Sequence, residues 1–411
     1  MASVVEIPEL HVTLLTAGRD HPYAFGMGTA LVSAGVMLDI IGADDLDSAQ
    51  WHNKPHVRFL NMRGDIAASA GLYAKVFRLL DYYRRLIIYS ATTKAKIFHI
   101  LWNNKFETFD RVPLMLYYKL LGKKTVLTVH NVNIRARDSR DSRFNRLTLK
   151  LQYRLVDHLF VHTGRMKTEL IEQFNVPGEK ISVIPFGINN AVPHTDLSSQ
   201  EARHRLGIPE NDRTILFFGN IAPYKGLEYL IEAFRLIVMK SKTYRLIIAG
   251  NPKNCADYWS RVEDSLDRHP NRDRILQNIS FIPDAETEVY FKGADVSVLP
   301  YRHIFQSGVL SLSYSFGLPV IATDVGTLRE DVIEGQTGFM CKPENPADLA
   351  IVIEKYFSSE LFHDLERQRQ HIRDYARQRY SWDLVSVSTK QVYMQLLCKQ
   401  WTENDFQLTP R

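Results

Sequence analysis

Apolar residues recur along this chain in short runs, and each run is followed by a turn and then by a segment with helical spacing. His11–Leu15, Val36–Ile41 and Ile97–Trp102 are three such runs. Short apolar runs bounded by turn residues are typical of strands that are buried on both faces, as in a parallel sheet. The alternation of these strands with helices predicts an α/β fold with doubly wound sheets.

The first half of the chain has the pattern of one α/β domain. A polar loop with Gly18 and Arg19 follows the first strand, and we expect the next helix to run from about Thr29 to Gly35. The glycine spacing of this loop differs from the dinucleotide fingerprint, which argues against a nicotinamide cofactor. The loop is a candidate acceptor-side element, or alternatively a structural turn.

His130 and Asn131 come directly after the apolar run Thr125–Val129. In doubly wound sheets, ligands bind at the carboxyl ends of strands, so these two side chains are candidates for ligand contact. A single histidine at this position is more often structural. The basic run Arg135–Arg146 either contacts an anionic ligand or is simply solvated.

The second half repeats the pattern, with its clearest signal at 298–330. An apolar strand stops at Pro300, a polar loop leads to Gly308, and a helix follows that Gly317 ends. Free amides at the start of a helix in a glycine-containing loop form a natural anion site. We therefore expect Ser307, Gly308 and Val309 to present N–H groups to the diphosphate of a nucleotide-sugar. The alternative is an ordinary strand–helix turn.

Lys225 stands at the start of another helix of this half. It follows the apolar run Thr214–Phe218 and the turn residues Gly219 and Asn220. A cation at a helix start opposes the helix dipole, which favours negative charge there. A bound phosphate would remove that conflict, so the sequence indicates a ligand-binding lysine.

Length, composition and charge limit the number of domains, the location and the partners that these motifs can have. The chain has 411 residues, of which 45% are hydrophobic, enough for two domains with full cores. Three scattered cysteines form neither a metal motif nor a disulfide framework, and the amino terminus lacks the pattern of a signal peptide, so we expect a cytoplasmic protein. Residues 1–190 carry 25 Lys and Arg against 17 Asp and Glu, which predicts an anionic partner for this half. Nucleic acid is disfavoured because no aromatic–basic motif is present.

Residues 71–96 combine helical apolar spacing with six basic residues and one acidic residue, Asp81. Such a helix can lie on an anionic bilayer, with Tyr82 and Tyr83 at the interface. This would place the protein peripherally on the inner face of the plasma membrane. The alternative is a helix that packs on the sheet and exposes a solvated basic face.

Several of these segments together resemble the retaining, family 4 glycosyltransferases of the GT-B fold. The matching segments occur in family order between Ile181 and Tyr356, and they read VIPFGIN, FFGNIAPYKGLEYLIEAF, ADVSVLPY, FGLPVIATDVGTLRE and EGQTGFMCKPENPADLA. The resemblance implies two Rossmann-like domains facing a cleft, here 1–190 on the acceptor side and 191–385 for the nucleotide-sugar. It also implies a last segment, 386–411, that crosses back to the first domain, and a reaction that requires no metal and no cofactor.

Carried over by position, the resemblance gives roles to particular residues. Lys225 would bind the donor phosphates together with Gly219, Asn220 and the Ser307–Val309 loop. His130 would lie near the sugar and the α-phosphate. The remaining residues implied by the resemblance are Pro283 at the nucleobase and Gly18, Arg19, Asn131 and Arg165 on the acceptor side.

This chain departs from the family pattern at two points. Where many members have an arginine on the phosphates, this chain has Asn220, and it also lacks two glutamates. Those positions, counted from Gly317, hold Ile304 and Leu312, and neither side chain can accept a hydroxyl hydrogen bond. Candidate substitutes on the sugar or ribose are Gln306, Ser311 and Glu330. The departure keeps two other functions open, a GT-B sugar-nucleotide epimerase and a catalytically silent GT-B binding protein. For a transferase, the basic first half favours a lipid-linked glycan or an exopolysaccharide intermediate as acceptor.

Overall fold

A computed structural model gives the three-dimensional structure of the chain. It describes residues 10–18, 21–64, 72–137, 141–189, 192–253, 255–304 and 306–405. Within these ranges, side chains are described except at 72–75 and 399–405.

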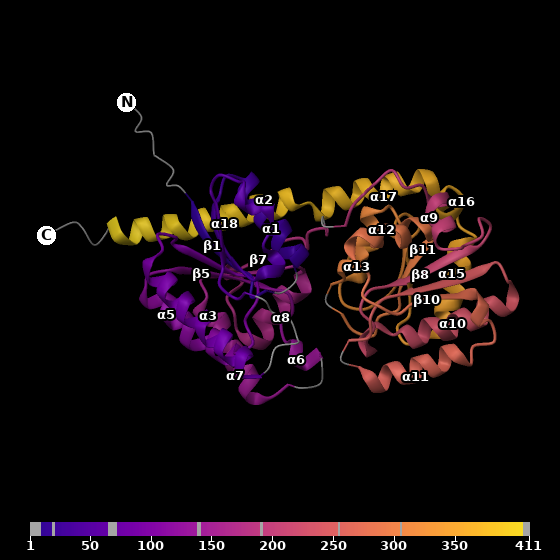
Figure 1. The fold of residues 1–411 in the computed structure, drawn as a ribbon, viewed down its shortest axis with the longest axis horizontal. Helices are drawn as coiled ribbons and strands as arrows, with labels where there is room; N and C mark the ends of the chain where they lie inside the picture. Colours follow the sequence, from indigo (N-terminus) through magenta and orange to yellow (C-terminus); the bar gives the residue numbers. More distant parts are fainter. Residues whose placement is uncertain are drawn as a thin grey trace, which may run out of the picture. The chain divides into compact units, whose positions relative to one another are not determined.

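The chain forms two compact units, each of which is built on its own parallel sheet (Figure 1). Unit 1 comprises residues 1–187 and 382–411, and unit 2 comprises residues 188–381. The sequence analysis placed the boundaries at 190 and 385. The α/β class with two doubly wound parallel sheets is confirmed.

Unit 1 contains a seven-stranded sheet with the order β3-β2-β1-β4-β5-β6-β7, in which all neighbouring strands are parallel. The strands are β1 His11–Leu15, β2 Met37–Gly42, β3 Val57–Asn61, β4 Ile97–Ile100, β5 Lys124–Val129, β6 His158–Val161 and β7 Ile181–Val183. The sequence analysis did not predict β3, which lies at the edge of the sheet.

Unit 2 contains a six-stranded parallel sheet with the order β10-β9-β8-β11-β12-β13. Its strands are β8 Arg213–Phe218, β9 Tyr244–Ala249, β10 Ile275–Asn278, β11 Val296–Leu299, β12 Val320–Thr323 and β13 Gly338–Cys341. Here too one edge strand, β10, was not predicted.

The strand order reverses at one place in each sheet, and this is where open α/β sheets bind their ligands. The reversal lies between β1 and β4 in unit 1 and between β8 and β11 in unit 2. The loop after β8 carries Lys225, and the loop after β11 leads to Ser307. The two anion-binding candidates of the sequence therefore flank the reversal point of unit 2.

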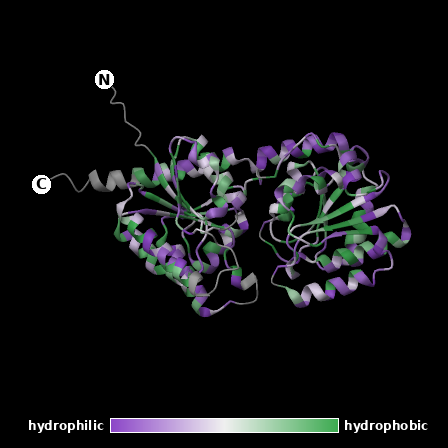
Figure 2. Cartoon of the chain, in the orientation of Figure 1, coloured by the Kyte–Doolittle hydropathy of each residue, from purple (hydrophilic) through white to green (hydrophobic). Residues whose placement is uncertain are grey.

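Helices and short turns connect the strands of each unit. Unit 1 contains α1 His21–Ser33, α2 Ala49–His52, α3 Leu72–Thr92, α4 Glu107–Phe109, α5 Met115–Leu120, α6 Ile134–Arg137, α7 Arg143–Leu155, α8 Gly164–Phe174 and α18 Trp382–Asp405. Unit 2 contains α9 Ser199–Arg205, α10 Leu227–Lys240, α11 Ala256–Asp267, α12 Asp284–Gly293, α13 Gly308–Ser315, α14 Leu328–Asp331, α15 Pro346–Phe357, α16 Glu360–His363 and α17 Leu365–Tyr380. Figure 2 shows strands that are mostly hydrophobic and helices that carry hydrophilic residues as well. Each sheet is thus the apolar centre of its unit.

The first helix begins at His21, so the prediction that it begins near Thr29 is wrong. Gly26, which precedes the predicted helix start, lies inside α1, where a β-carbon would overlap the indole ring of Trp382. This glycine permits close packing of α1 against α18. A pattern of glycines alone does not distinguish this use from a loop.

Helix α3 packs differently from the prediction that Tyr82 and Tyr83 face a membrane interface. Both tyrosines are buried, and Tyr83 donates a hydrogen bond to Asp110 at 2.8 Å. The solvent-facing side instead carries Phe77 and Leu80. None of the described helices combines the length and apolar character that crossing a membrane requires.

The last helix, α18, belongs to unit 1, where a buried hydrogen bond joins it to the sheet. The hydroxyl of Tyr393 lies 2.5 Å from Nδ1 of His99 on β4, and the hydroxyl of Thr128 on β5 lies 2.7 Å from Nε2. Complete burial lowers the pKa of His99 to about 3, so this ring is neutral near pH 7. Lys390 of the same helix donates to the Ala34 carbonyl at 2.6 Å.

The hydrogen bond between α18 and β4 makes a test of stability possible. Tyr393→Phe leaves a ring nitrogen of His99 buried without its partner, which costs about 1–3 kcal/mol. We expect the midpoint of chemical denaturation to fall accordingly. Val387→Ala, an exposed change on the same helix, serves as the control and should leave the midpoint almost unchanged. Equal midpoints for Tyr393→Phe and the wild type would contradict this account.

Candidate functional site

The loop after β8 brings Lys225 next to the residues that follow β11. Lys225 ends the short turn Pro223–Lys225, and Gly226 then adopts a left-handed conformation with φ +64°. A β-carbon on Gly226 would overlap the carbonyl oxygen of Pro300. Glycine is therefore required here both by its backbone angle and by the close approach of the two loops.

The Lys225 side chain extends toward the turn at Ser307. Its ammonium nitrogen lies 5.3 Å from the ring centroid of Tyr301, whose hydroxyl is 3.3 Å from the Ser307 hydroxyl. A β-carbon built on Gly219 would lie 3.3 Å from this ammonium and 3.4 Å from a methyl carbon of Val309. The lysine, Gly219 and the turn before α13 thus surround one small region of unit 2.

Lys225 is a buried cation that has no counter-charge among the described residues. Its exposed fraction is 6%, and no carboxylate among the described residues pairs with it. Burial lowers the pKa of Lys225 to about 8, because desolvation disfavours the charged form. Cations this deeply buried are normally paired, so the site is electrostatically suited to a bound anion.

Main-chain donors lie beside this cation at the start of α13. The Ser307 hydroxyl caps the helix and accepts from the Leu310 amide at 3.2 Å. The amides of Ser307, Gly308 and Val309 donate to no acceptor in the described ranges of the chain. The first amides of a helix have no partner within it and attract negative charge. Together with Lys225 they make a positive surface that can bind phosphate.

The positions near the missing glutamates differ in what they offer a ligand. Leu312 is 6% exposed and belongs to an apolar cluster. Ser311 donates its hydroxyl to the Gly308 carbonyl at 3.1 Å, and Glu330 is exposed on α14. Gln306 has a buried side-chain oxygen that accepts no hydrogen bond. Of the three candidate substitutes, Gln306 is therefore the one with a buried hydrogen-bond acceptor that is available to a ligand.

Two further candidates of unit 2 lie at the surface. Asn220 is exposed directly after Gly219, and Pro283 is exposed immediately before α12. Neither side chain is held in one geometry by a described hydrogen bond, so their roles on the phosphates and the nucleobase stay predictions.

In unit 1, His130 lies in a buried aromatic cluster at the carboxyl edge of the sheet. Its ring stacks on Trp102 with centroids 4.3 Å apart and meets the edge of Tyr23 at 4.7 Å. Nδ1 of His130 is 3.2 Å from Nε2 of His162. Nε2 of His130 and the side-chain oxygen of Asn131 are buried without hydrogen-bond partners. Burial and the neighbouring His162 hold the pKa of His130 well below its usual value, so the ring is neutral.

The remaining acceptor-side candidates of unit 1 are less defined. Gly18 is left-handed, with φ +59°, and its amide is 3.4 Å from the Thr16 hydroxyl. Arg165 is exposed near the start of α8. Arg19 lies outside the described residues.

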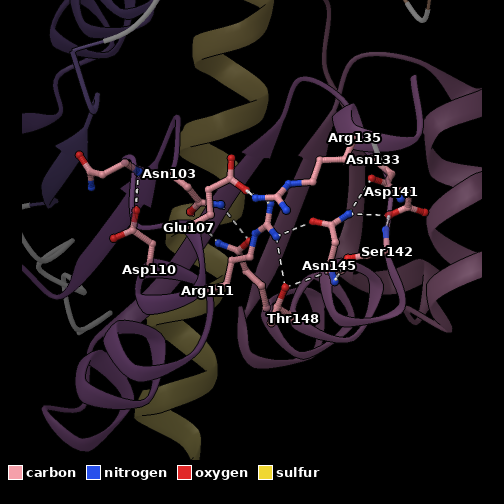
Figure 3. A network of polar contacts seen from close by, with 12 residues as sticks. Asn103, Glu107, Asp110, Arg111, Asn133, Arg135, Asp141, Ser142, Asn145 and Thr148 are labelled. Atoms are coloured by element: carbon pink, nitrogen blue, oxygen red, sulfur yellow. Dashed lines mark hydrogen bonds and ion pairs between the residues drawn. The ribbon is translucent and has the colours of Figure 1, made fainter. Parts of the chain in front are cut away.

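Arg135, in the basic run after β5, is partly exposed and takes part in an ion pair. Its guanidinium pairs with Glu107 at 3.1 Å, and Glu107 also binds the buried Arg111 at 2.8 Å (Figure 3). Arg111 in turn donates to Asn145 on α7 at 2.9 Å. These contacts fix Arg135 within a structural network. Sequence reasoning missed this network because its members are far apart in the chain.

Sequence reasoning also missed the residues around His130. His130 and His162 come directly after β5 and β6, and Trp102 is the second residue after β4, so the common signal was a ring residue within two positions of three strand ends. Tyr23 gave no such signal, because its place within α1 was not predicted. The described residues contain no group of three or more His, Cys, Asp or Glu side chains arranged to hold a metal ion.

Comparison with known protein families matches almost the whole described chain in two parts. The model for glycosyl transferases group 1 matches residues 198–379, and the model for Glycosyltransferase Family 4 matches residues 23–192. The two matches fall on unit 2 and on unit 1 respectively.

Individual relatives are distant. An uncharacterized glycosyltransferase, MJ1607 of Methanocaldococcus jannaschii, is 29% identical over 56% of this chain and 57% of its own length. A D-inositol 3-phosphate glycosyltransferase of Corynebacterium aurimucosum is 26% identical over 66% of this chain and 64% of its own length. Less than two thirds of the length of each relative is therefore matched.

Two solved structures share the fold at low identity. Sucrose-phosphate synthase from Thermosynechococcus elongatus has a TM-score of 0.76 and 18% identity, with 95% of this chain and 100% of that chain covered. HepE from Anabaena, in complex with UDP and glucose, has a TM-score of 0.71 and 15% identity, with 93% and 98% covered. At these low identities, the similarity to the two structures shows a shared fold.

The low pKa of Lys225 gives a pH dependence that UDP can probe. The charged form of Lys225 attracts a diphosphate, so its contribution to UDP affinity is complete well below pH 8. Above about pH 8 the amine loses its proton, and this contribution falls by up to about tenfold in affinity per pH unit. We expect the ratio of wild-type to Lys225→Met affinity, measured calorimetrically, to fall between pH 8 and 10. The ratio cancels the titration of UDP itself.

Lys240→Met provides the matched control, because Lys240 is exposed and pairs with Glu354. The ratio of wild-type to Lys240→Met affinity should stay constant over the same pH range. A Lys225 ratio that stays constant as well would remove this cation from anion binding.

Proposed function

This chain belongs to the group 1 and family 4 glycosyltransferases with the GT-B fold, and from that premise we propose that it is a glycosyltransferase acting on a nucleotide-sugar donor. The observation that carries the proposal is the uncompensated Lys225 cation beside the free amides of Gly308 and Val309. A diphosphate supplies the negative charge that this arrangement lacks. Such a group is present in a nucleoside-diphosphate sugar and is released by glycosyl transfer.

The proposed mechanism uses charge that grows during the reaction. As the glycosidic bond breaks, negative charge accumulates on the leaving diphosphate and the sugar gains oxocarbenium character. Lys225 and the amides of the Ser307–Val309 turn interact more strongly with that charge than with the ground state, and this lowers the barrier. These donors would neutralise the leaving group without a metal or another cofactor.

We propose retention of the anomeric configuration, as the family resemblance implies. A leaving-phosphate oxygen would accept the proton of the attacking hydroxyl, so that no separate carboxylate base is needed. The Gln306 side-chain oxygen would accept a hydrogen bond from a hydroxyl of the donor sugar or ribose, in place of a family glutamate. This oxygen is buried and has no hydrogen-bond partner. His130 would contact a sugar hydroxyl from unit 1.

The donor and acceptor are proposed by class. A UDP-sugar is the first donor to test, because a structural neighbour, HepE, is complexed with UDP-glucose. The acceptor would be a hydroxyl of a lipid-linked glycan or of an exopolysaccharide intermediate. The excess of basic residues in 1–190 supports an anionic acceptor.

One observation favours a different function. Leu312, at the position of a family glutamate, is packed in an apolar cluster and cannot take over the role of a carboxylate. A GT-B protein that binds nucleotide without turnover would carry such a change. An epimerase is the other alternative, and it would release nucleotide without an acceptor. Nucleotide release that depends on an acceptor distinguishes the transferase from both.

Removal of the proposed phosphate-binding cation tests the mechanism. Lys225→Ala should lower turnover at least tenfold, which is about 1.4 kcal/mol in the barrier, because transition-state charge is less stabilised. Acceptor-dependent release of nucleoside diphosphate is the measurement. Lys240→Ala should keep wild-type turnover. Full activity of Lys225→Ala would exclude this lysine from the mechanism.

We also propose that helix α3 contacts an acidic membrane on the cytoplasmic side. Phe77 is 72% exposed and Leu80 is 59% exposed. The same helix carries two exposed arginines, Arg84 and Arg85, which share one acidic partner, Asp81, and so keep a net positive charge. Exposed apolar side chains next to basic ones are typical of a helix at a bilayer interface. Tyr82 and Tyr83 take no part in this surface, because they are buried.

Liposome flotation tests the contact of α3 with lipid. The wild type should float with vesicles that contain acidic lipid, and Phe77→Ser/Leu80→Ser should reduce the bound fraction several-fold because less apolar area is buried. The matched control is Met239→Ser/Phe281→Ser, which removes exposed apolar side chains from unit 2. Flotation that is independent of acidic lipid would end this proposal.

A further inference from the structure

Two histidines end neighbouring strands of unit 1 and are joined by a hydrogen bond. β5 and β6 pair Val129 with Val161, so the next residues, His130 and His162, come side by side. Nε2 of His162 lies 3.2 Å from Nδ1 of His130. Only one proton can lie between two ring nitrogens, so the donor in this pair has to be decided by the other contacts of each ring.

The second nitrogen of His162 decides the direction. Nδ1 of His162 lies 3.3 Å from the carbonyl oxygen of Ile184. A carbonyl oxygen can only accept, so this nitrogen carries the proton. Nε2 of a neutral His162 then holds a lone pair and accepts from Nδ1–H of His130. The opposite arrangement would set the lone pair of His162 against the lone pairs of the carbonyl.

Both rings are neutral, so each has one N–H and one lone pair, and this fixes the direction of the two hydrogen bonds. Burial lowers the pKa of His162 to about 4 and holds that of His130 well below its usual value, and the neighbouring His162 adds to the shift at His130. The Leu101 carbonyl raises the pKa of His130 as a hydrogen-bond acceptor but does not outweigh burial, and because Nε2 has no hydrogen-bond partner this contact agrees with a proton on Nδ1. With its proton on Nδ1, His130 presents only a lone pair at Nε2.

The Nε2 atom of His130 is buried and has no hydrogen-bond partner. The side-chain oxygen of the next residue, Asn131, is a second buried acceptor without a partner. Unsatisfied buried acceptors are costly, so each indicates a ligand group that donates a hydrogen bond. A hydroxyl can donate to them, whereas an ionised phosphate oxygen has no proton to give and would meet lone pairs.

We propose that His162 is a positioning residue that fixes His130 as a hydrogen-bond acceptor, so that this part of unit 1 recognises the hydroxyl groups of a sugar and not a phosphate. The inference rests on the proposed glycosyltransferase function for the identity of the ligand. It revises the role implied by the family resemblance, in which His130 lies near both the sugar and the α-phosphate. The tautomer itself does not depend on any activity.

Neutron diffraction from crystals of the whole chain at neutral pD tests the tautomer directly. We expect deuterium on Nδ1 of His130 and on Nδ1 of His162, with Nε2 of His130 bare. Deuterium on Nε2 of His130, alone or together with Nδ1, would overturn the inference. This outcome is independent of whether the protein transfers sugar.

Kinetics of two variants test the positioning role. His162→Phe keeps a ring of similar size in the cluster but removes the acceptor, and we expect the KM for one sugar-bearing substrate to rise about tenfold, as loss of a fixed hydrogen bond predicts. His162→Gln offers an amide oxygen near the position of Nε2 and should restore most of that loss. Unchanged KM values in His162→Phe, or an equal defect in both variants, would contradict the positioning role.

The two experiments separate failure of this inference from failure of the proposed function. A wild-type chain that transfers no sugar from any donor would refute the glycosyltransferase proposal and leave the neutron result valid. If His162→Phe does not fold, the neutron structure of the wild type still decides the tautomer.

Discussion

The candidate site of unit 2 depends on one costly arrangement, a buried lysine that has no counter-charge within the described ranges of the chain. Burying an ammonium group away from water is unfavourable, and proteins usually pair such a group or let it lose its proton. Burial lowers the pKa of Lys225 to about 8, so the group is destabilised but still mostly charged near pH 7. A structural lysine would gain from a carboxylate at this place. Its absence among the described residues is understandable if the missing charge arrives with a ligand.

Backbone geometry holds that lysine where it is. The turn Pro223–Lys225 can approach the loop after β11 only because residue 226 has no side chain and tolerates a positive φ. The turn before α13 is held by the Ser307 cap, which uses its hydroxyl for the helix and leaves neighbouring amides available. The cation and the amides are therefore prepositioned by loops at the strand-order reversal, and little reorganisation is needed for an anion to bind.

Sequence patterns predicted the central strands and the loops that carry Lys225 and Ser307, because those features are local. Apolar runs such as Val296–Leu299 are buried on both faces and leave a clear signal. The edge strands β3 and β10 were missed because Arg58 and Gln277 interrupt their apolar runs. The orientation of Tyr82 on α3 and the ring cluster around His130 depend on contacts between distant segments. No local spacing contains that information.

The two units use the same sheet topology to offer opposite hydrogen-bonding character. Unit 2 presents donors, namely an ammonium group and free amides, at the point where its strand order reverses. Unit 1 presents acceptors after β5, in His130 and Asn131. An anionic group such as a diphosphate complements the donors of unit 2, and a hydroxyl group complements the acceptors of unit 1. A duplicated fold can therefore be specialised without changing its strands, since a few residues directly after them decide whether the edge of the sheet donates or accepts.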